Sequence, residues 1–226
     1  MSDASAAAPL TLTQLPLFPL QTVLFPGGWM PLRIFEVRYL DMINRCIKAG
    51  APFGVVCLTE GSEVRRLDPS AAPGQAGFAA EAFHPIGTLA QIEQVERPQA
   101  GLMLIHCRGQ QRFHIRSSRQ LPHGLWVGDV VLDPAERVIA VPEHLVSTRD
   151  ALQRVLANLQ EREPSSMNEL PLQPPYQWDD CGWVANRWAE LLPLPPEVKQ
   201  RLMTLDNPLL RLELVSDLLD RMGVER

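Results

Sequence analysis

The stretch from residue 15 to residue 50 constrains the fold of this chain most strongly, because prolines interrupt its apolar runs. Four prolines stand within or beside two short apolar runs: Pro16, Pro19, Pro26 and Pro31. Each lacks a backbone N–H and has a fixed φ, so it suits an edge, a strand start or a bulge. The stretch therefore predicts short or edge strands of a small barrel, joined by a tight turn at Pro26-Gly27-Gly28.

A helix is expected from Glu36 to Lys48. Apolar residues at helical spacing define its expected buried face: Tyr39, Leu40, Ile43 and Ile47. Gly50 suits a left-handed C-cap, and Glu36 and Lys48 lie at the helix ends where the dipole favours their charges. The chain therefore opens with two strand runs, a turn and one capped helix.

Two ordered motifs resemble the N-terminal, substrate-binding domain of Lon proteases, and especially small proteins that carry this module alone. The first is PLFPL at 16–20, LFPG at 24–27 and PLRIFEVRY at 31–39. The second is IGTLAQI at 86–92, followed by GQQRF at 109–113. The resemblance implies an antiparallel, PUA-like pseudo-barrel followed by helices, and a role in binding polypeptide.

The pattern after the first helix supports a β domain. An apolar run at 52–58 predicts a buried strand, and alternation from residue 86 followed by a turn at 98–101 predicts a hairpin. Gly109 is expected at a bulge or bend, and a last strand at 125–132. Six or seven antiparallel strands with one helix are expected. The Ala-, Pro- and Gly-rich run at 68–82 reads as a long surface loop, either disordered or a variable lobe.

Helical periodicity replaces strand alternation after Asp133-Pro134. One helix is expected from near Pro142 to before Pro164, and a Pro- and Ser-rich linker at 163–177. Three more helices follow, with starts at Asp179-Asp180, at Pro195-Pro196 and at an Asn207 N-cap. The fold class is therefore α+β, with a mobile tail at 1–12, a β domain at 13–133 and a bundle of about four helices at 134–226.

Composition indicates a soluble, cytoplasmic protein. The 226 residues carry a net charge of −5, and only two of the 21 basic residues are lysine. The first ten residues lack the basic start of a signal peptide, and no apolar run is long enough for a membrane helix. Four scattered cysteines form no C-x-x-C motif, which fits a reducing compartment.

The motifs of catalysis are absent from the sequence. The chain has no Gly-Lys pair, hence no phosphate loop of an ATPase, and its 226 residues leave no room for the Lon protease domain. The five histidines lack metal-binding spacing, so no metal and no cofactor are expected. Cys181 is the best candidate nucleophile, but Asp179 and Asp180 oppose a thiolate, so we interpret it as a small apolar residue. A non-enzymatic module is expected, with no catalytic residues.

The candidate peptide-binding residues are Phe25, Trp29 and Met30, which flank the Gly-Gly turn. Large apolar groups at such a tip can form an exposed patch for an unfolded or extended polypeptide, and the polypeptide can also add as a strand to a barrel edge. The alternative is that they close one end of the barrel. Three motif residues are interpreted as structural: Glu36, Arg38 and Tyr39.

A second hypothesis is RNA binding, since PUA-like domains often bind RNA. The residues that would serve it are Arg108, Arg112, Arg116 and Arg119. The acidic net charge argues against nucleic acid, and a solvated strand face is the alternative interpretation. The expected partners are therefore polypeptide clients, with a separate ATPase or protease as a further candidate.

Overall fold

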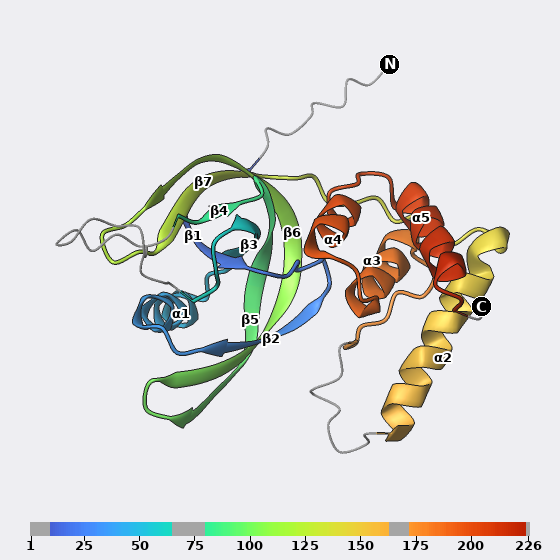
Figure 1. Ribbon diagram of the computed structural model, residues 1–226, viewed down its shortest axis with the longest axis horizontal. Helices are drawn as coiled ribbons and strands as arrows, with labels where there is room; N and C mark the ends of the chain where they lie inside the picture. Colours follow the sequence, from blue (N-terminus) through green and yellow to red (C-terminus); the bar gives the residue numbers. More distant parts are fainter. Residues whose placement is uncertain (1–9, 65–79, 163–171, 225–226) are drawn as a thin grey trace.

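The computed structural model of the chain describes residues 10–64, 80–162 and 172–224. It has a β lobe that carries one helix and a helical lobe beside it (Figure 1). The predicted loop at 68–82 and the predicted linker at 163–177 fall largely outside the described residues. Thr11 and Leu12, expected in the N-terminal tail, belong instead to the first strand.

Seven strands build the β lobe in the described part of the chain. They are β1 (Thr11–Leu20), β2 (Trp29–Ile34), β3 (Phe53–Glu60), β4 (Ala82–Phe83), β5 (Ile86–Gln99), β6 (Leu102–Gln120) and β7 (Trp126–Leu132). The sheet runs β1-β7-β6-β5-β3-β4, and a β1–β3 pairing closes it into a barrel. The expected antiparallel barrel is confirmed, except that β1 and β3 pair in parallel, with Leu17 opposite Gly54.

The longest strand, β6, has two different neighbours on one of its sides. Its first part, from Met103 to Arg108, pairs with β2, and its second part, from Phe113 to Gln120, pairs with β7. Apolar residues alternate toward the interior in the first part, where Met103, Ile105 and Cys107 are buried. β2 pairs with β6 and with no other strand among the described residues, so one side of β2 is an edge.

Helix α1 (Val37–Ala49) starts and ends one residue later than expected, with Gly50 at φ 61° as the left-handed C-cap. Tyr39 and Ile43 are buried as expected, but Ile47 is 38% exposed. Met42 and Cys46 complete the buried stripe instead, because positions i, i+3, i+4 and i+7 from Tyr39 share one face of a helix.

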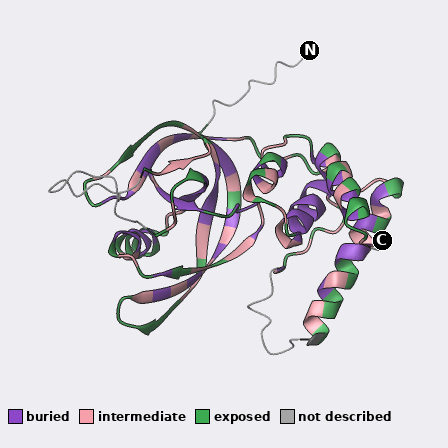
Figure 2. Ribbon diagram, viewed as in Figure 1, coloured by how far each residue is buried: buried purple, intermediate pink, exposed green. Residues whose placement is uncertain are grey.

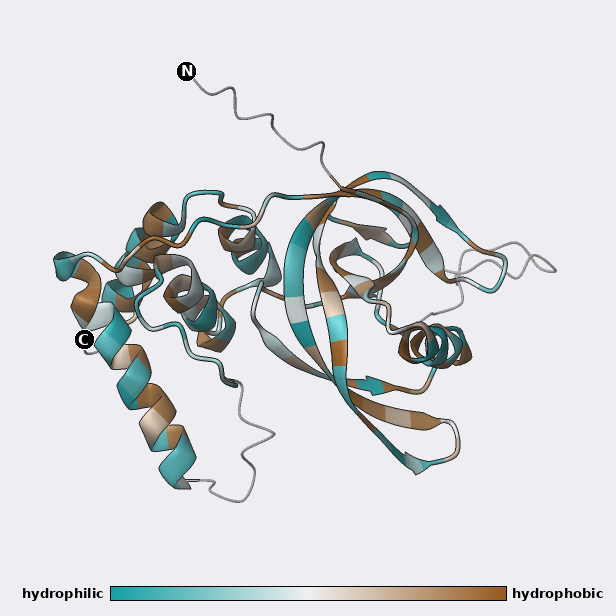
Figure 3. Cartoon of the chain, turned by 180° about the vertical axis from the view of Figure 1, so that it is seen from behind, coloured by the Kyte–Doolittle hydropathy of each residue, from teal (hydrophilic) through white to brown (hydrophobic). Residues whose placement is uncertain are grey.

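The helical lobe consists of a short 3-10 turn η1 (Glu143–Leu145), α2 (Val146–Arg162), α3 (Cys181–Leu191), α4 (Pro196–Met203) and α5 (Pro208–Arg221). The predicted helix starts are confirmed: the Asp180 side chain caps α3, and the Asn207 side chain accepts a hydrogen bond from the Leu210 N–H. Met222, at the C-cap of α5, is 44% exposed. Figure 3 shows hydrophilic and hydrophobic residues alternating along α2, as expected of an amphipathic surface helix.

Helix α3 is the buried centre of the helical lobe, and it is purple along its length in Figure 2. Its core cluster extends into the β lobe, where Val23, Phe25 and Cys57 pack with Trp183, Val184 and other helical residues. A second cluster fills the barrel beneath α1, and a third lies around Phe113. The two lobes therefore share one continuous apolar contact.

Candidate functional site

The turn before β2 is held by a close approach of two backbones. Gly27 has a φ of 74°, which favours glycine, and its N–H donates to the Gly109 carbonyl at 2.8 Å. The Gly109 N–H donates in turn to the Gly28 carbonyl at 2.9 Å. A side chain at Gly109 would collide with the Phe25 carbonyl oxygen. The expected bend at Gly109 is thus the place where β6 meets the Pro26–Gly28 turn.

Helix α3 supports the same turn from the helical lobe. Arg187, 2% exposed, donates to the Pro26 carbonyl at 3.0 Å and forms an ion pair with Glu190 at 2.7 Å. Burial raises the pKa of Glu190 to about 7, and the charges of Arg187 and Lys199 counteract this rise. The start of β2 is therefore anchored to the helical lobe.

Phe25 is fully buried in the cluster shared by the two lobes. Phe25 therefore cannot belong to an exposed patch, and the prediction that it contacts a bound peptide there is wrong. The reason is tertiary, because α3 covers the side of the turn on which Phe25 lies.

Trp29 and Met30 are both partly exposed, but their surroundings differ. The Trp29 ring stacks on His106 with centroids 5.3 Å apart, and the Arg108 guanidinium lies 5.2 Å from its centre. Met30 packs against the barrel core and lines a surface groove. Successive side chains of a strand point to opposite faces, so the two residues do not form one patch.

The groove beside β2 has a volume of about 360 Å³. One wall is the continuous run from Met30 to Glu36, and the other includes Phe18 and Leu20 at the end of β1. The remaining lining residues are Thr22, Tyr39, Glu63 and Val64. Phe35 is 50% exposed at its rim and the adjacent Val37 is 72% exposed. Such an apolar hollow with exposed apolar rims is typical of a binding site.

The motif residues Glu36, Arg38 and Tyr39 support one end of this groove. Arg38 is buried, contacts Glu36 at 3.2 Å and Glu81 at 3.5 Å, and donates to the Gly124 carbonyl at 2.7 Å. Tyr39 stacks on Phe18 with ring centroids 4.0 Å apart. The Glu36 side chain makes no hydrogen bond to the helix start, although it precedes α1. These contacts agree with a structural role.

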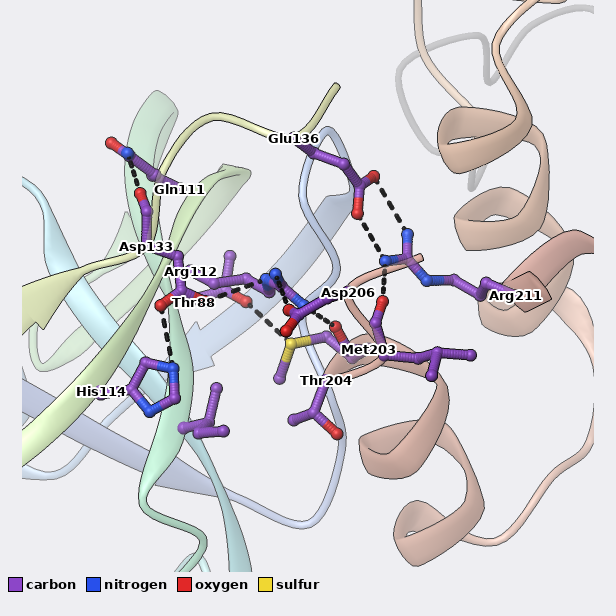
Figure 4. A network of polar contacts seen from close by, with 12 residues as sticks. Thr88, Gln111, Arg112, His114, Asp133, Glu136, Met203, Thr204, Asp206 and Arg211 are labelled. Carbon is purple, nitrogen blue, oxygen red and sulfur yellow. Dashed lines mark hydrogen bonds and ion pairs between the residues drawn. The ribbon is translucent and has the colours of Figure 1, made fainter. Parts of the chain in front are cut away.

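The four arginines of the RNA hypothesis do not share one exposed face. Arg112 is buried between the lobes, where it contacts Asp133 at 3.2 Å, the Met203 carbonyl at 2.9 Å and Asp206 at 2.7 Å (Figure 4). Arg108 is partly buried and pairs with Glu93 at 2.6 Å. Arg116 and Arg119 are exposed. The alternative basic face therefore does not form as one surface, because Arg112 is buried in ion pairs between the lobes and Arg108 is paired with Glu93.

The four cysteine thiols are poor nucleophiles. Burial, with a smaller contribution from Asp180, raises the pKa of Cys181 to about 11, and the thiol contacts the Ala140 carbonyl. Burial also raises the pKa of Cys57 to about 11 and that of Cys107 to about 12. Within the described ranges no cluster of three or more His, Cys, Asp or Glu could hold a metal ion, and no helix is long and apolar enough to span a membrane.

The groove's position could not be read from the periodicity of β2 alone. Two signals in the sequence do point to it: Pro31 marks an edge strand, and Phe35 and Val37 stand on either side of Glu36 where the chain enters α1. The contribution of Phe18, Leu20 and Val64 depends on how β1 and the segment after β3 fold beside β2.

Comparisons with known proteins agree with this fold. Residues 14–221 match the family model of the ATP-dependent protease La (LON) substrate-binding domain. A Lon N-terminal domain protein from Xanthomonas campestris is 30% identical, with a TM-score of 0.65 over 91% of this chain and 98% of its own. The N-terminal domain of the Mycobacterium avium complex Lon protease is 18% identical, with a TM-score of 0.54 over 93% of this chain and 98% of its own, and shows the same fold. The comparison with curated proteins gave no match.

Proposed function

Because this chain belongs to the family of Lon substrate-binding domains, we propose that it binds exposed apolar segments of polypeptides, and that they bind in the groove beside β2. The observation that carries the proposal is the groove itself, an apolar hollow of about 360 Å³ lined by Met30, Leu32 and Phe35. The apolar side chains of an unfolded client are exposed to water, so transfer of these side chains from water into the groove is favourable.

The size of the groove limits how much affinity apolar contact can supply. Fully burying one side chain of the size of leucine or phenylalanine contributes about 1.5–3 kcal/mol. Binding with a dissociation constant of about 1 μM requires about 8 kcal/mol after the cost of ordering the client. One or two anchors are therefore insufficient, and the client must make further contacts along the walls.

The proposed activity is binding without chemistry. The described cysteines are buried thiols with raised pKa values, which removes the thiolate that nucleophilic catalysis needs. The carboxylates nearest the groove have structural partners: Glu36 pairs with Arg38, and Glu63 accepts the Gln21 N–H at 2.6 Å.

The test is fluorescence anisotropy with reduced, carboxymethylated α-lactalbumin, a permanently unfolded chain, titrated with the protein without nucleotide. We expect saturable binding that survives a change from low to high salt, because apolar contacts are not weakened by screening. Phe35→Ala should weaken binding about three- to tenfold, which corresponds to roughly 1 kcal/mol of lost apolar contact.

Leu210→Ala is the matched control, because Leu210 is a comparably exposed apolar residue on α5, far from the groove in sequence and outside its lining. This variant should bind as the wild type does. An equal loss of affinity in Phe35→Ala and Leu210→Ala would show that the client does not bind in the groove. Binding that vanishes at high salt would instead indicate a charged ligand, such as RNA.

A further inference from the structure

We infer that the client adds to the free edge of β2 as an extended strand at Pro31 and Arg33, and that Pro31 sets the register of that strand. The inference rests on the proposed function and specifies how the polypeptide is held. Its basis is the hydrogen-bonding pattern of the β2–β6 ladder together with the position of the groove.

The direction of each backbone group in β2 follows from the ladder. The Gly109 N–H donates to the Gly28 carbonyl, and the register continues without a shift from Trp29 opposite Arg108 to Ile34 opposite Met103. Antiparallel strands alternate hydrogen-bonded and non-hydrogen-bonded pairs. The residues of β2 that face β6 are therefore Met30, Leu32 and Ile34, and the backbone groups of Trp29, Pro31 and Arg33 face the other side.

Pro31 fits this alternation. A proline cannot donate to a ladder, so within a sheet it occupies positions whose N–H would point away from the neighbouring strand. Along the part of the edge that lines the groove, from Pro31 to Arg33, the outward backbone groups are two carbonyls, from Pro31 and Arg33, and one N–H, from Arg33. Pro31 and Arg33 are both exposed, and both line the groove.

Another backbone strand satisfies such an edge best, because its N–H and carbonyl groups repeat at the same spacing. The groove runs beside the same residues from Met30 to Glu36, so a strand seated on the edge would place alternate side chains into it. Backbone hydrogen bonds and apolar anchors would then act together, which supplies the contacts that the apolar groove alone lacks.

The occupant is a client segment and not a second copy of β2. Two β2 strands paired about Pro31 would bring together two residues without an N–H, and they would leave both proline carbonyls without donors at the centre. Pairing displaced by one residue, about Leu32, would leave the Arg33 carbonyls opposite prolines. Pairing about Arg33 would place two guanidinium groups directly opposite each other, and like charges there are destabilising. Edge prolines prevent such self-pairing in natural sheets. A client with an ordinary residue opposite Pro31 can donate to its carbonyl, and its own carbonyl at that position stays in water.

The first test compares two substitutions of Arg33, with the same unfolded α-lactalbumin as the probe. Arg33→Pro removes the outward N–H of residue 33, whereas Arg33→Ala removes the same charged side chain and retains that N–H. We expect Arg33→Pro to weaken binding about three- to tenfold relative to Arg33→Ala, the effect of one net hydrogen bond. Urea unfolding of both variants verifies that they are folded.

The second test adds a donor. Pro31→Ala supplies an N–H on the outward side of β2, and it should tighten binding of the probe about three- to tenfold. It should also broaden the set of bound registers, seen as more cross-linked positions when a photoreactive group replaces Phe35. This variant remains informative if Arg33→Pro fails to fold.

The outcomes separate the two proposals. Absence of binding by the wild type would overturn the proposed function itself. Wild-type binding that Phe35→Ala weakens, together with equal affinities for Arg33→Pro and Arg33→Ala and no gain in Pro31→Ala, would retain the groove and overturn strand addition. Weaker binding of Arg33→Pro with tighter binding of Pro31→Ala would support it.

Discussion

The guanidinium group of Arg112 on β6 lies 2.7 Å from the carboxylate of Asp206, 94 residues later in the chain, and joins the β lobe to the loop between α4 and α5. Arg112 also contacts Asp133, which pairs with His114 at 2.9 Å (Figure 4). A second arginine, Arg211, binds Glu136 through two nitrogens. The lobes are thus connected by ion pairs as well as by a shared core.

Arg112→Ala should destabilise the protein by about 2–4 kcal/mol. The substitution leaves the Asp133 carboxylate, only 13% exposed, without its arginine partner, whereas Asp206 is 89% exposed and loses little. Urea unfolding measures the change, and the midpoint should move with little change in slope. Arg119→Ala, in which an exposed arginine is removed, should stay within about 0.5 kcal/mol of the wild type.

A chain ending at Asp133 should not fold as a stable β domain, although residues 13–133 are predicted to form one. Removal of the helical lobe would expose Val23, Phe25 and Cys57, which pack against helical residues. We expect binding of a dye that reports exposed apolar surface, and a broad urea transition. A sharp transition without dye binding would contradict the shared core and support two independent domains.

Gly109→Ala should cost about 2–4 kcal/mol and weaken client binding. The added methyl group would collide with the Phe25 carbonyl, a backbone atom that cannot rotate away. The turn that starts β2 would be displaced, and the edge with it. Urea unfolding and the α-lactalbumin titration measure the two effects. Gln110→Ala, at the exposed neighbouring position, should change neither measurement.

Asp129 should contribute to stability in a pH-dependent manner. The Gln14 N–H donates to it at 2.9 Å and the Ser117 hydroxyl at 3.1 Å, and these bonds lower the pKa of Asp129 below its ordinary value of 3.8. A carboxylate with a lowered folded-state pKa stabilises the protein above pH 3.8 and loses this contribution as the pH falls through the folded-state value.

The urea midpoint of the wild type should therefore exceed that of Asp129→Asn at pH 6, and the difference should shrink as the pH falls below 3.8. A difference that stays constant from pH 6 to pH 2 would show that Asp129 acts through packing and not through its charge.

The four cysteines should resist alkylation in the folded protein at pH 8. Each is buried, and burial raises their thiol pKa values, to about 12 for Cys107. Mass spectrometry after treatment with iodoacetamide should show no modification in native buffer and four modifications in urea. Rapid labelling of a single cysteine under native conditions would reveal local opening at that position.

Much of the fold was predictable from local patterns. The start and end of α1, the caps of α3 and α5, the β5–β6 hairpin and the bend at Gly109 each depend on neighbouring residues, whose conformational preferences are visible in the sequence. The motifs at 16–39 and 86–113 identified the family for the same reason. What local patterns left out was the burial of Phe25 and the separation of Trp29 from Met30.

The amino-acid sequence by itself determined the fold class and the order of the elements. It also determined the presence of an edge strand, because Pro31 lacks a backbone N–H and restricts φ in any fold. Tertiary structure decided which residues are available for binding. It covered Phe25 with α3, used Arg112 to join the lobes, and placed β1 and β2 on two sides of one groove. These outcomes arise from contacts between residues far apart in the chain, which no local preference encodes.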